Sequence, residues 1–226
     1  MSRYFTNFSC VKAEMDSCAA ACGRDPAEIL LLAVSKTMSE SAIRELYDSG
    51  VRAFGENRIP ELERKAAALP EDIQWHFIGP LQSNKIRKAV KLASLIHSIE
   101  SISAIEKLDR IAGEEGKNIS FLLEVNVSGE ESKGGLSPQE FMSAARAAAA
   151  CRHAVFAGLM TMAPLGAPET LLRSVFSGLE KLRNQAQEEL HIDLPILSMG
   201  MSGDYKTAIE CGSTIIRIGT AIFSTE

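Results

Sequence analysis

The sequence alternates short apolar runs with longer segments of helical periodicity, and it does so eight times. Such alternation is typical of a parallel sheet whose strands are connected by helices lying outside it. Eight strands joined in this way favour a closed (β/α)8 barrel of the TIM type over an open, doubly wound sheet, which usually shows a glycine-rich turn after its first strand. The expected strands are residues 29–34, 52–55, 74–78, 95–99, 120–127, 155–160, 195–199 and 214–218. The expected helices between them are residues 39–49, 60–69, 81–91, 101–115, 138–150, 168–189 and 203–211.

A further helical pattern at residues 7–22 precedes the first apolar run, and the sequence after the last run is too short for an eighth outer helix. We therefore expect an extra N-terminal helix to take the place that this outer helix would fill in the barrel. No linker, low-complexity tract or change in composition divides the chain. The sequence therefore predicts a single domain over residues 1–226.

Composition and patterning exclude several classes of function. The chain has 24 Lys and Arg against 29 Asp and Glu, a net charge of −5, and no basic run that could serve as a nucleic-acid footprint. It shows neither a signal-peptide core at its N-terminus nor an apolar run that approaches a membrane span. Its five cysteines include no C-x-x-C pair, and its four histidines show no ligand spacing. We expect a cytoplasmic protein that binds no metal, nucleic acid or membrane.

The first apolar run ends in a single lysine, in the sequence ILLLAVSKT. Because side chains alternate along a strand, Leu32, Val34 and Lys36 share one face. An ammonium group at the end of a buried face has to find an anion, reach solvent, or lose its proton and become a nucleophile. A lysine that forms a Schiff base requires the last of these. The structural alternative is a loop lysine that follows a core strand.

The loops after the expected seventh and eighth strands carry small and hydroxylic residues. The first contains Ser198, Gly200 and Ser202, and the second contains Gly219 and Thr220. Either loop alone is ordinary capping chemistry. In a TIM barrel, however, these two loops are the usual place for a bound phosphate, because glycines let the backbone approach it and hydroxyl groups donate to it. Together they predict a phosphate site.

Arg217 lies within the eighth apolar run, between Ile216 and Ile218. If the two isoleucines face the helices, Arg217 points into the barrel, where its guanidinium needs an acceptor. That acceptor is either a carboxylate such as Glu124 on the fifth strand, in a buried ion pair, or a bound ligand.

Asn57 follows the second strand, where an asparagine is usually a turn residue.

A lysine on the first strand, a phosphate site after the last two strands and an inward arginine suit pyridoxal 5′-phosphate. Its aldehyde would condense with Lys36, its phosphate would lie on Ser202, Gly219 and Thr220, and its pyridine nitrogen would face Arg217.

Several motifs resemble those of the pyridoxal-phosphate homeostasis protein family, which is similar to the barrel domain of alanine racemases. They span nearly the whole barrel, and they are AVSKT (33–37), FGENR (54–58), WHFIGPLQSNK (75–85), VNVSGEESKGG (125–135), GLMTMAP (158–164), SMGMSGDY (198–205) and IRIGTAIF (216–223). The family usually continues with glycine after Ile-Phe, whereas this chain ends in Ser224, Thr225 and Glu226.

The resemblance implies a role for each matching residue. Lys36 would be the Schiff-base lysine, Asn57 would lie near the ring hydroxyl, and Arg217 would face the ring nitrogen. The remaining cofactor-binding residues would line the phosphate loops, and they are Ser198, Gly200, Ser202, Gly219 and Thr220.

The resemblance also implies a protein that holds the cofactor and takes part in intracellular vitamin B6 and amino-acid homeostasis without efficient turnover. An arginine at the pyridine nitrogen disfavours the protonated ring, which makes the cofactor a poorer electron sink. A racemase also needs a second base on the opposite face of its substrate. Of the three tyrosines, only Tyr205 is expected near the site. A monomeric carrier that serves cofactor-requiring apoenzymes is therefore our prediction, and a free-standing amino-acid racemase is the alternative.

Two further interpretations stay open. One is a Schiff-base aldolase in which the two loops bind a sugar phosphate, and the other is a barrel in which Lys36 and Arg217 are structural. The roles of Lys133, on the loop after the fifth strand, and of Lys206 stay open as well.

Overall fold

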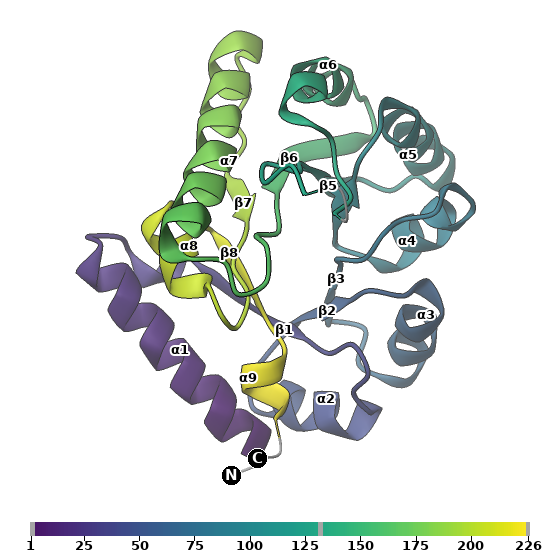
Figure 1. The fold of residues 1–226 in the computed structure, drawn as a ribbon. Helices are drawn as coiled ribbons and strands as arrows, with labels where there is room; N and C mark the ends of the chain where they lie inside the picture. Colours follow the sequence, from purple (N-terminus) through teal and green to yellow (C-terminus); the bar gives the residue numbers. More distant parts are fainter. Residues whose placement is uncertain (1–2, 131–132, 225–226) are drawn as a thin grey trace.

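Eight parallel strands close into a barrel in chain order in the computed structural model, which describes residues 3–130 and 133–224 (Figure 1). The expected (β/α)8 fold is thereby confirmed. The strands are β1 (Leu30–Val34), β2 (Ala53–Glu56), β3 (Gln74–Phe77), β4 (Leu95–Ile99), β5 (Ile119–Glu124), β6 (Ala154–Met160), β7 (Ile196–Ser198) and β8 (Ile215–Ile218). The fifth strand ends at Glu124 rather than at residue 127, because Val125 pairs only in an isolated bridge with Leu136.

Helices cover the outside of the barrel, and their bounds agree with the sequence periodicity. They are α2 (Glu40–Asp48), α3 (Ile59–Ala68), α4 (Ile86–Leu92), α5 (Ile102–Glu115), α6 (Pro138–Ala149), α7 (Glu169–Leu190) and α8 (Tyr205–Glu210). The expected fourth helix starts later, since a short 3-10 turn over Ser83–Lys85 precedes it. At the start of α6, Ser137 and Glu140 form a capping box in which each side chain accepts from the other residue's backbone N–H.

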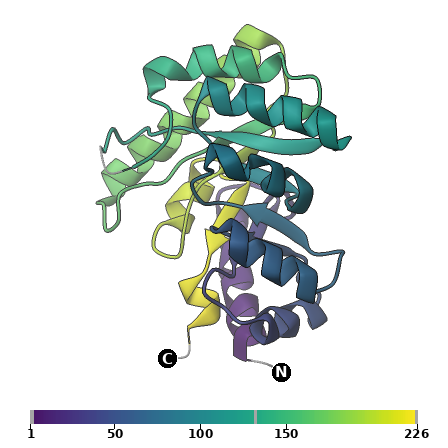
Figure 2. The ribbon, with the colours of Figure 1, turned by 90° about the vertical axis from the view of Figure 1, so that its right-hand side faces the viewer.

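The chain end differs from the expectation. A short helix, α9 (Thr220–Phe223), follows β8 and packs beside α1 (Arg3–Ala21), as both views show (Figures 1 and 2). The side-chain amide of Asn7 donates to the carbonyl of Ile222 at 3.1 Å and so joins the two helices. Helix α1 also contacts α2 and α8, which places it over the gap in the ring of helices, as expected. Thr225 and Glu226, where the sequence departs from the family pattern, lie outside the described residues.

The apolar residues of the barrel form two separate layers. The larger layer lies between strands and helices and includes Leu31 and Ala33 of β1. The smaller layer fills the lower barrel interior with residues from six strands, and these are Leu32, Ala53, Leu95, Leu122, Ala157, Met160 and Ile215. Because this layer fills the barrel interior, the carboxyl ends of the strands are left to form a site. No helix within residues 3–130 and 133–224 has the length and apolar character that a membrane crossing needs.

Candidate functional site

Lys36 lies just beyond β1, at the mouth of the barrel. Val34 and Ser35 before it are buried, whereas Lys36 itself is exposed. Thr37 has a φ of 68°, a left-handed conformation that a β-branched residue rarely adopts, so the chain turns sharply after the lysine. No carboxylate in the described part of the chain forms an ion pair with Lys36. The lysine is therefore available to solvent or to a ligand.

A buried ion pair fixes the backbone on either side of this mouth. Nζ of Lys65, on α3, lies 2.7 Å from Oε1 of Glu56 at the end of β2, and both side chains are fully buried. Lys65 also donates to the carbonyl of Ser35 at 2.9 Å, and the Ser35 hydroxyl donates to Glu56 at 2.6 Å. The pair therefore ties together the chain neighbours of Lys36 and Asn57. Burial raises the pKa of Glu56, against the hydrogen bonds from Lys65 and Ser35 that lower it.

Asn57 follows β2 at the neighbouring position of the mouth and is half-buried. Its backbone is held closely by Gly79, because a Cβ added at residue 79 would lie 2.2 Å from the Asn57 carbonyl oxygen. Only glycine fits this contact. The Asn57 side chain itself makes no hydrogen bond with any described residue, so its amide stays available at the mouth.

Arg217 is buried on β8 and points into the barrel, between Ile216 and Ile218 on the helix side. Its Nη1 donates to the carbonyl and the hydroxyl of Ser198 at 2.7 and 2.6 Å, and its Nη2 donates to the carbonyl of Thr161 at 2.9 Å. Among the described residues it forms no ion pair, so the ion pair with Glu124 is absent. Burial lowers the pKa of Arg217 to about 10, which leaves it a cation at neutral pH.

A chain of hydrogen bonds runs from Arg217 across the barrel to two histidines. The hydroxyl of Ser198 lies 2.8 Å from Nδ1 of His97, and Nε2 of His97 lies 3.0 Å from Nδ1 of His76. Ser198 accepts from Arg217, so its own proton has to go to His97, and the Nε2–H of His97 then donates to His76. Burial lowers the pKa of His76 to about 4 and that of His97 well below its usual value. Both rings are neutral at pH 7 and hold Arg217 in one orientation.

Glu124 adds a carboxyl group to the same interior. It shares the inward face of β5 with Leu122 and is 6% exposed, and its carboxylate accepts no hydrogen bond within the described residues. Burial raises the pKa of Glu124 to about 7, with a further increase from Glu100 that outweighs the opposing effect of Arg217. In the closed barrel β5 lies opposite β1, so this acid faces the side that carries Lys36.

The raised pKa of Glu124 predicts a pH-dependent contribution to stability. The folded state binds the proton more tightly than the unfolded state, so this contribution is complete below about pH 4.5 and is lost as the pH rises through about 7. The free energy of unfolding of Glu124→Gln, compared with that of the wild type, should therefore increase by up to about 3 kcal/mol from pH 5 to pH 8. Urea unfolding of both proteins at the two pH values measures the difference. If the free energies of unfolding of the two proteins changed in parallel with pH, the carboxyl group of Glu124 would not have a raised pKa.

The two predicted phosphate loops are held against β8 and β1. Gly200 has a φ of +97°, and a Cβ there would lie 2.7 Å from Cβ of Ala208. The Gly200 carbonyl accepts from the backbone N–H of Arg217 at 2.9 Å, which joins the loop after β7 to β8. A Cβ at Gly219 would lie 3.2 Å from the Val34 carbonyl oxygen, so the loop after β8 lies against the end of β1. The loop after β8 therefore reaches the strand that leads to Lys36, and the loop after β7 is joined to β8 beside it.

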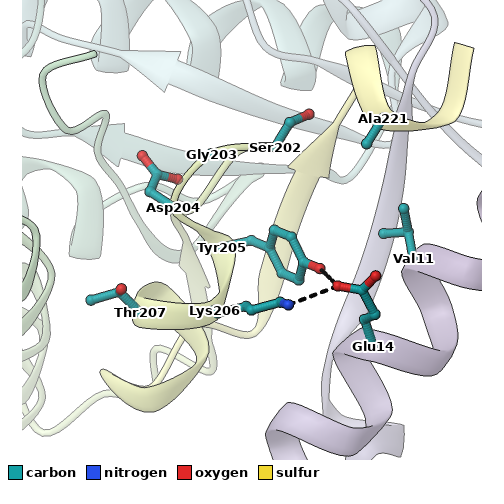
Figure 3. A pocket seen from close by; sticks show the side chains of 9 residues that line it. All are labelled: Val11, Glu14, Ser202, Gly203, Asp204, Tyr205, Lys206, Thr207 and Ala221. Carbon is teal, nitrogen blue, oxygen red and sulfur yellow. Dashed lines mark hydrogen bonds and ion pairs between the residues drawn. The ribbon is translucent and has the colours of Figure 1, made fainter. Parts of the chain in front are cut away.

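A cavity of about 390 Å³ lies between the loop after β7, the start of α8, α1 and α9 (Figure 3). Of the predicted site residues only Ser202 lines it, together with Gly203, the first residues of α8 and part of α1. In this cavity the hydroxyl of Tyr205 donates to Glu14 at 2.9 Å, and Lys206 pairs with the same carboxylate at 2.7 Å (Figure 3). The hydroxyl of Tyr205 is thus hydrogen-bonded to a residue of α1.

Several polar groups around the mouth have no hydrogen-bond partner among the described residues. The side chains of Lys36, Asn57, Ser202 and Thr220, and Nε of Arg217, make no hydrogen bond or ion pair with any other described residue. An amine, an amide, two hydroxyls and a guanidinium N–H match the aldehyde, ring hydroxyl, phosphate and ring nitrogen of pyridoxal 5′-phosphate. The donor set therefore fits this cofactor.

Sequence reasoning missed two parts of this arrangement. His97 has no ligand spacing in the sequence, but its place two residues after Leu95 puts it on the inward face of β4. Lys65 showed no signal at all, because a lysine in a helical pattern is normally solvated. Its burial depends on Glu56, which the fold brings to it.

The alanine racemase N-terminal domain profile matches residues 26–226. The chain is 41% identical to the "Pyridoxal phosphate homeostasis protein" of Aquifex aeolicus, over 85% of each chain, and 39% identical to that of Pseudomonas aeruginosa, over 99% of this chain and 96% of the relative. Its structure is similar to that of PipY from Synechococcus elongatus with PLP bound, at a TM-score of 0.83 and 37% identity, over 93% of this chain and 99% of that one. Alanine racemase from Corynebacterium glutamicum shares the fold, at a TM-score of 0.73 and 18% identity, over 96% of this chain and 61% of that one.

Proposed function

Because the chain belongs to the pyridoxal phosphate homeostasis protein family, we propose that it binds pyridoxal 5′-phosphate as a Schiff base on Lys36 and releases it to apoenzymes. It would thereby take part in the homeostasis of vitamin B6 and amino acids without an efficient turnover of its own. A monomer in the cytoplasm remains part of this prediction.

One observation carries the proposal, namely the unused polar groups around the mouth. Ordinarily a folded protein pairs its polar side chains or leaves them scattered in solvent. Here five such groups, from the segments that follow β1, β2, β7 and β8 and from β8 itself, converge on one end of the barrel. The pairing of Leu32 with Arg217 sets β1 beside β8, so Lys36 follows the strand adjacent to the one that carries Arg217. The structure of a relative with PLP bound supports the choice of this cofactor as the ligand.

The residues of the site explain why binding would not lead to fast chemistry. When bound, the cofactor supplies an aldehyde for the lysine and a ring that can accept electrons. Arg217 stays charged at neutral pH and has only N–H donors, so its Nε–H could donate a hydrogen bond to the ring nitrogen but could not accept one from a protonated ring. Arg217 would therefore favour the unprotonated ring. The hydrogen bonds to Ser198 and Thr161 keep the guanidinium in this position.

A racemase remains the second candidate, and Glu124 is the observation that favours it. A carboxyl group with a pKa near 7 can give and take a proton at neutral pH, and this one faces the barrel interior opposite β1. Tyr205 does not fill this role, because its hydroxyl donates to Glu14 of α1.

Solvent deuterium distinguishes the two candidates. We expect the loaded protein, incubated with L- and D-alanine in D2O, to introduce no deuterium at the α-carbon above the rate of free pyridoxal phosphate. The same preparation should reactivate a pyridoxal-phosphate-dependent apoenzyme. Rapid deuterium incorporation that is lost in Glu124→Gln would instead establish a racemase and overturn the carrier proposal.

A further inference from the structure

Two thiols and a carboxylate meet on the outer surface, where α1 lies against α8. Sγ of Cys18, Sγ of Cys22 and a carboxylate oxygen of Glu210 all lie within 4.8 Å of one another. We propose that these three residues bind a thiophilic divalent cation of the Zn²⁺ class. Nothing in the proposed function requires this site, which stands apart from Lys36.

The fold brings the three ligands together from two helices. Cys18 and Cys22 are four residues apart and so share one face at the end of α1, where the N–H of Cys22 donates to the carbonyl of Cys18 at 3.2 Å. Glu210 is the last residue of α8, which packs against α1. The thiol of Cys18 also donates to the carbonyl of Lys206 at 3.7 Å, which is a further contact between the two helices.

The site lies at the end of the barrel opposite the mouth. Strand β7 runs toward the mouth, so α8 returns from it and its last residue, Glu210, lies near the start of β8. The C-terminal end of α1 likewise leads, through residues 22–29, to the start of β1. Cation binding here is therefore separate from the cofactor-binding groups.

The chemistry of the three groups suits zinc. Zn²⁺ binds thiolates at about 2.3 Å and carboxylate oxygens at about 2.1 Å in tetrahedral geometry, which places its ligands roughly 3.5 to 3.8 Å apart. Ligand atoms within 4.8 Å of one another reach these positions by small side-chain rotations. Each thiol would release its proton to solvent on coordination, and water would take the fourth position.

Neighbouring charges leave the site accessible. Oε2 of Glu210 pairs with Arg173, whereas the other carboxylate oxygen has no donor among the described residues and can face a cation. Arg173 also pairs with Glu169, so it does not depend on Glu210 alone. Cys22 and Glu210 are exposed, so a hydrated ion can reach them directly.

Zinc binding to the reduced full-length protein tests the proposal. We expect equilibrium dialysis against Zn²⁺ to load one ion per chain, to protect two thiols from a thiol reagent, and to raise the melting temperature because the ion joins α1 to α8. Cys18→Ser/Cys22→Ser should lose all three effects, and Glu210→Gln should weaken binding at least tenfold. Cys10→Ser, on the same helix, and Lys36→Ala should bind zinc as the wild type does.

Three outcomes would overturn the proposal. One is zinc binding that Cys18→Ser/Cys22→Ser retains, which would place the ion elsewhere. Another is zinc binding that protects no thiols. The third is a reduced protein that takes up no zinc. None of these results bears on cofactor binding by Lys36, so the two proposals fail or succeed independently.

Discussion

Lys36→Ala should leave a protein that no longer develops a visible absorption band when pyridoxal phosphate is added. The lysine is the only group of the proposed site that can form a covalent bond with the aldehyde, whereas the remaining groups contribute hydrogen bonds. We expect the affinity to fall on the order of a hundredfold or more, equivalent to about 3 kcal/mol. Titration of the apoprotein with cofactor, followed by absorbance, measures the loss.

Two features make this result specific. Lys36 is exposed and makes no ion pair with a described carboxylate, so its replacement should leave the melting temperature unchanged. Lys133→Ala is the matched control, because Lys133 is the second amine on a loop near the mouth and should keep the band. If Lys36→Ala retained the band and Lys133→Ala lost it, the Schiff base would belong to the loop after β5.

The buried pair of Lys65 and Glu56 should give the largest effect on stability. In Lys65→Met the Glu56 carboxylate loses its counter-ion while it stays buried, and one of its oxygens, Oε2, already lacks a hydrogen-bond partner. Removal of one partner of such a pair costs about 3 to 5 kcal/mol. We expect a corresponding decrease in the free energy of unfolding, measured in urea at pH 8. The deficit should shrink as the pH falls, because burial raises the pKa of Glu56 and protonation then removes the unpaired charge.

The double variant Glu56→Gln/Lys65→Met provides the control. It removes both charges, so it should be considerably more stable than Lys65→Met alone. If the single and the double variants lost the same free energy, the cost would come from packing and not from an unpaired charge. A cofactor affinity that falls in Lys65→Met would further show that the pair positions the backbone beside Lys36 and Asn57.

The barrel could be predicted because each of its elements has a strong local signal. Apolar runs of strand length and amphipathic segments of helix length alternate from residue 29 onward, and closure follows from their number. Helix α9 was missed because four residues carry no periodicity. It forms where Asn7, more than two hundred positions away, binds its last turn. The late start of α4 has the same origin, since the 3-10 turn before it has no distinct sequence pattern.

The site was predictable in part for the same reason. Alternation along β8 turned Arg217 inward, and the position of Lys36 at a strand end placed it at the mouth. The partners of Arg217 were not predictable, because they are carbonyls and a hydroxyl from β7 and from the residue after β6, which approach only in the closed barrel. The spacing of Cys18 and Cys22 does not match C-x-x-C, but on a helix a spacing of four also brings two thiols together.

Borohydride reduction of the cofactor-loaded wild type, followed by peptide mapping, tests the central claim most directly. Reduction converts a Schiff base into a stable secondary amine, which marks the lysine that carried the cofactor. We predict a pyridoxyl group of one equivalent per chain on the peptide that contains Lys36, together with loss of the visible band. A label on any other lysine, or a colourless protein that takes up no label, would contradict the assignment of this barrel mouth to pyridoxal phosphate.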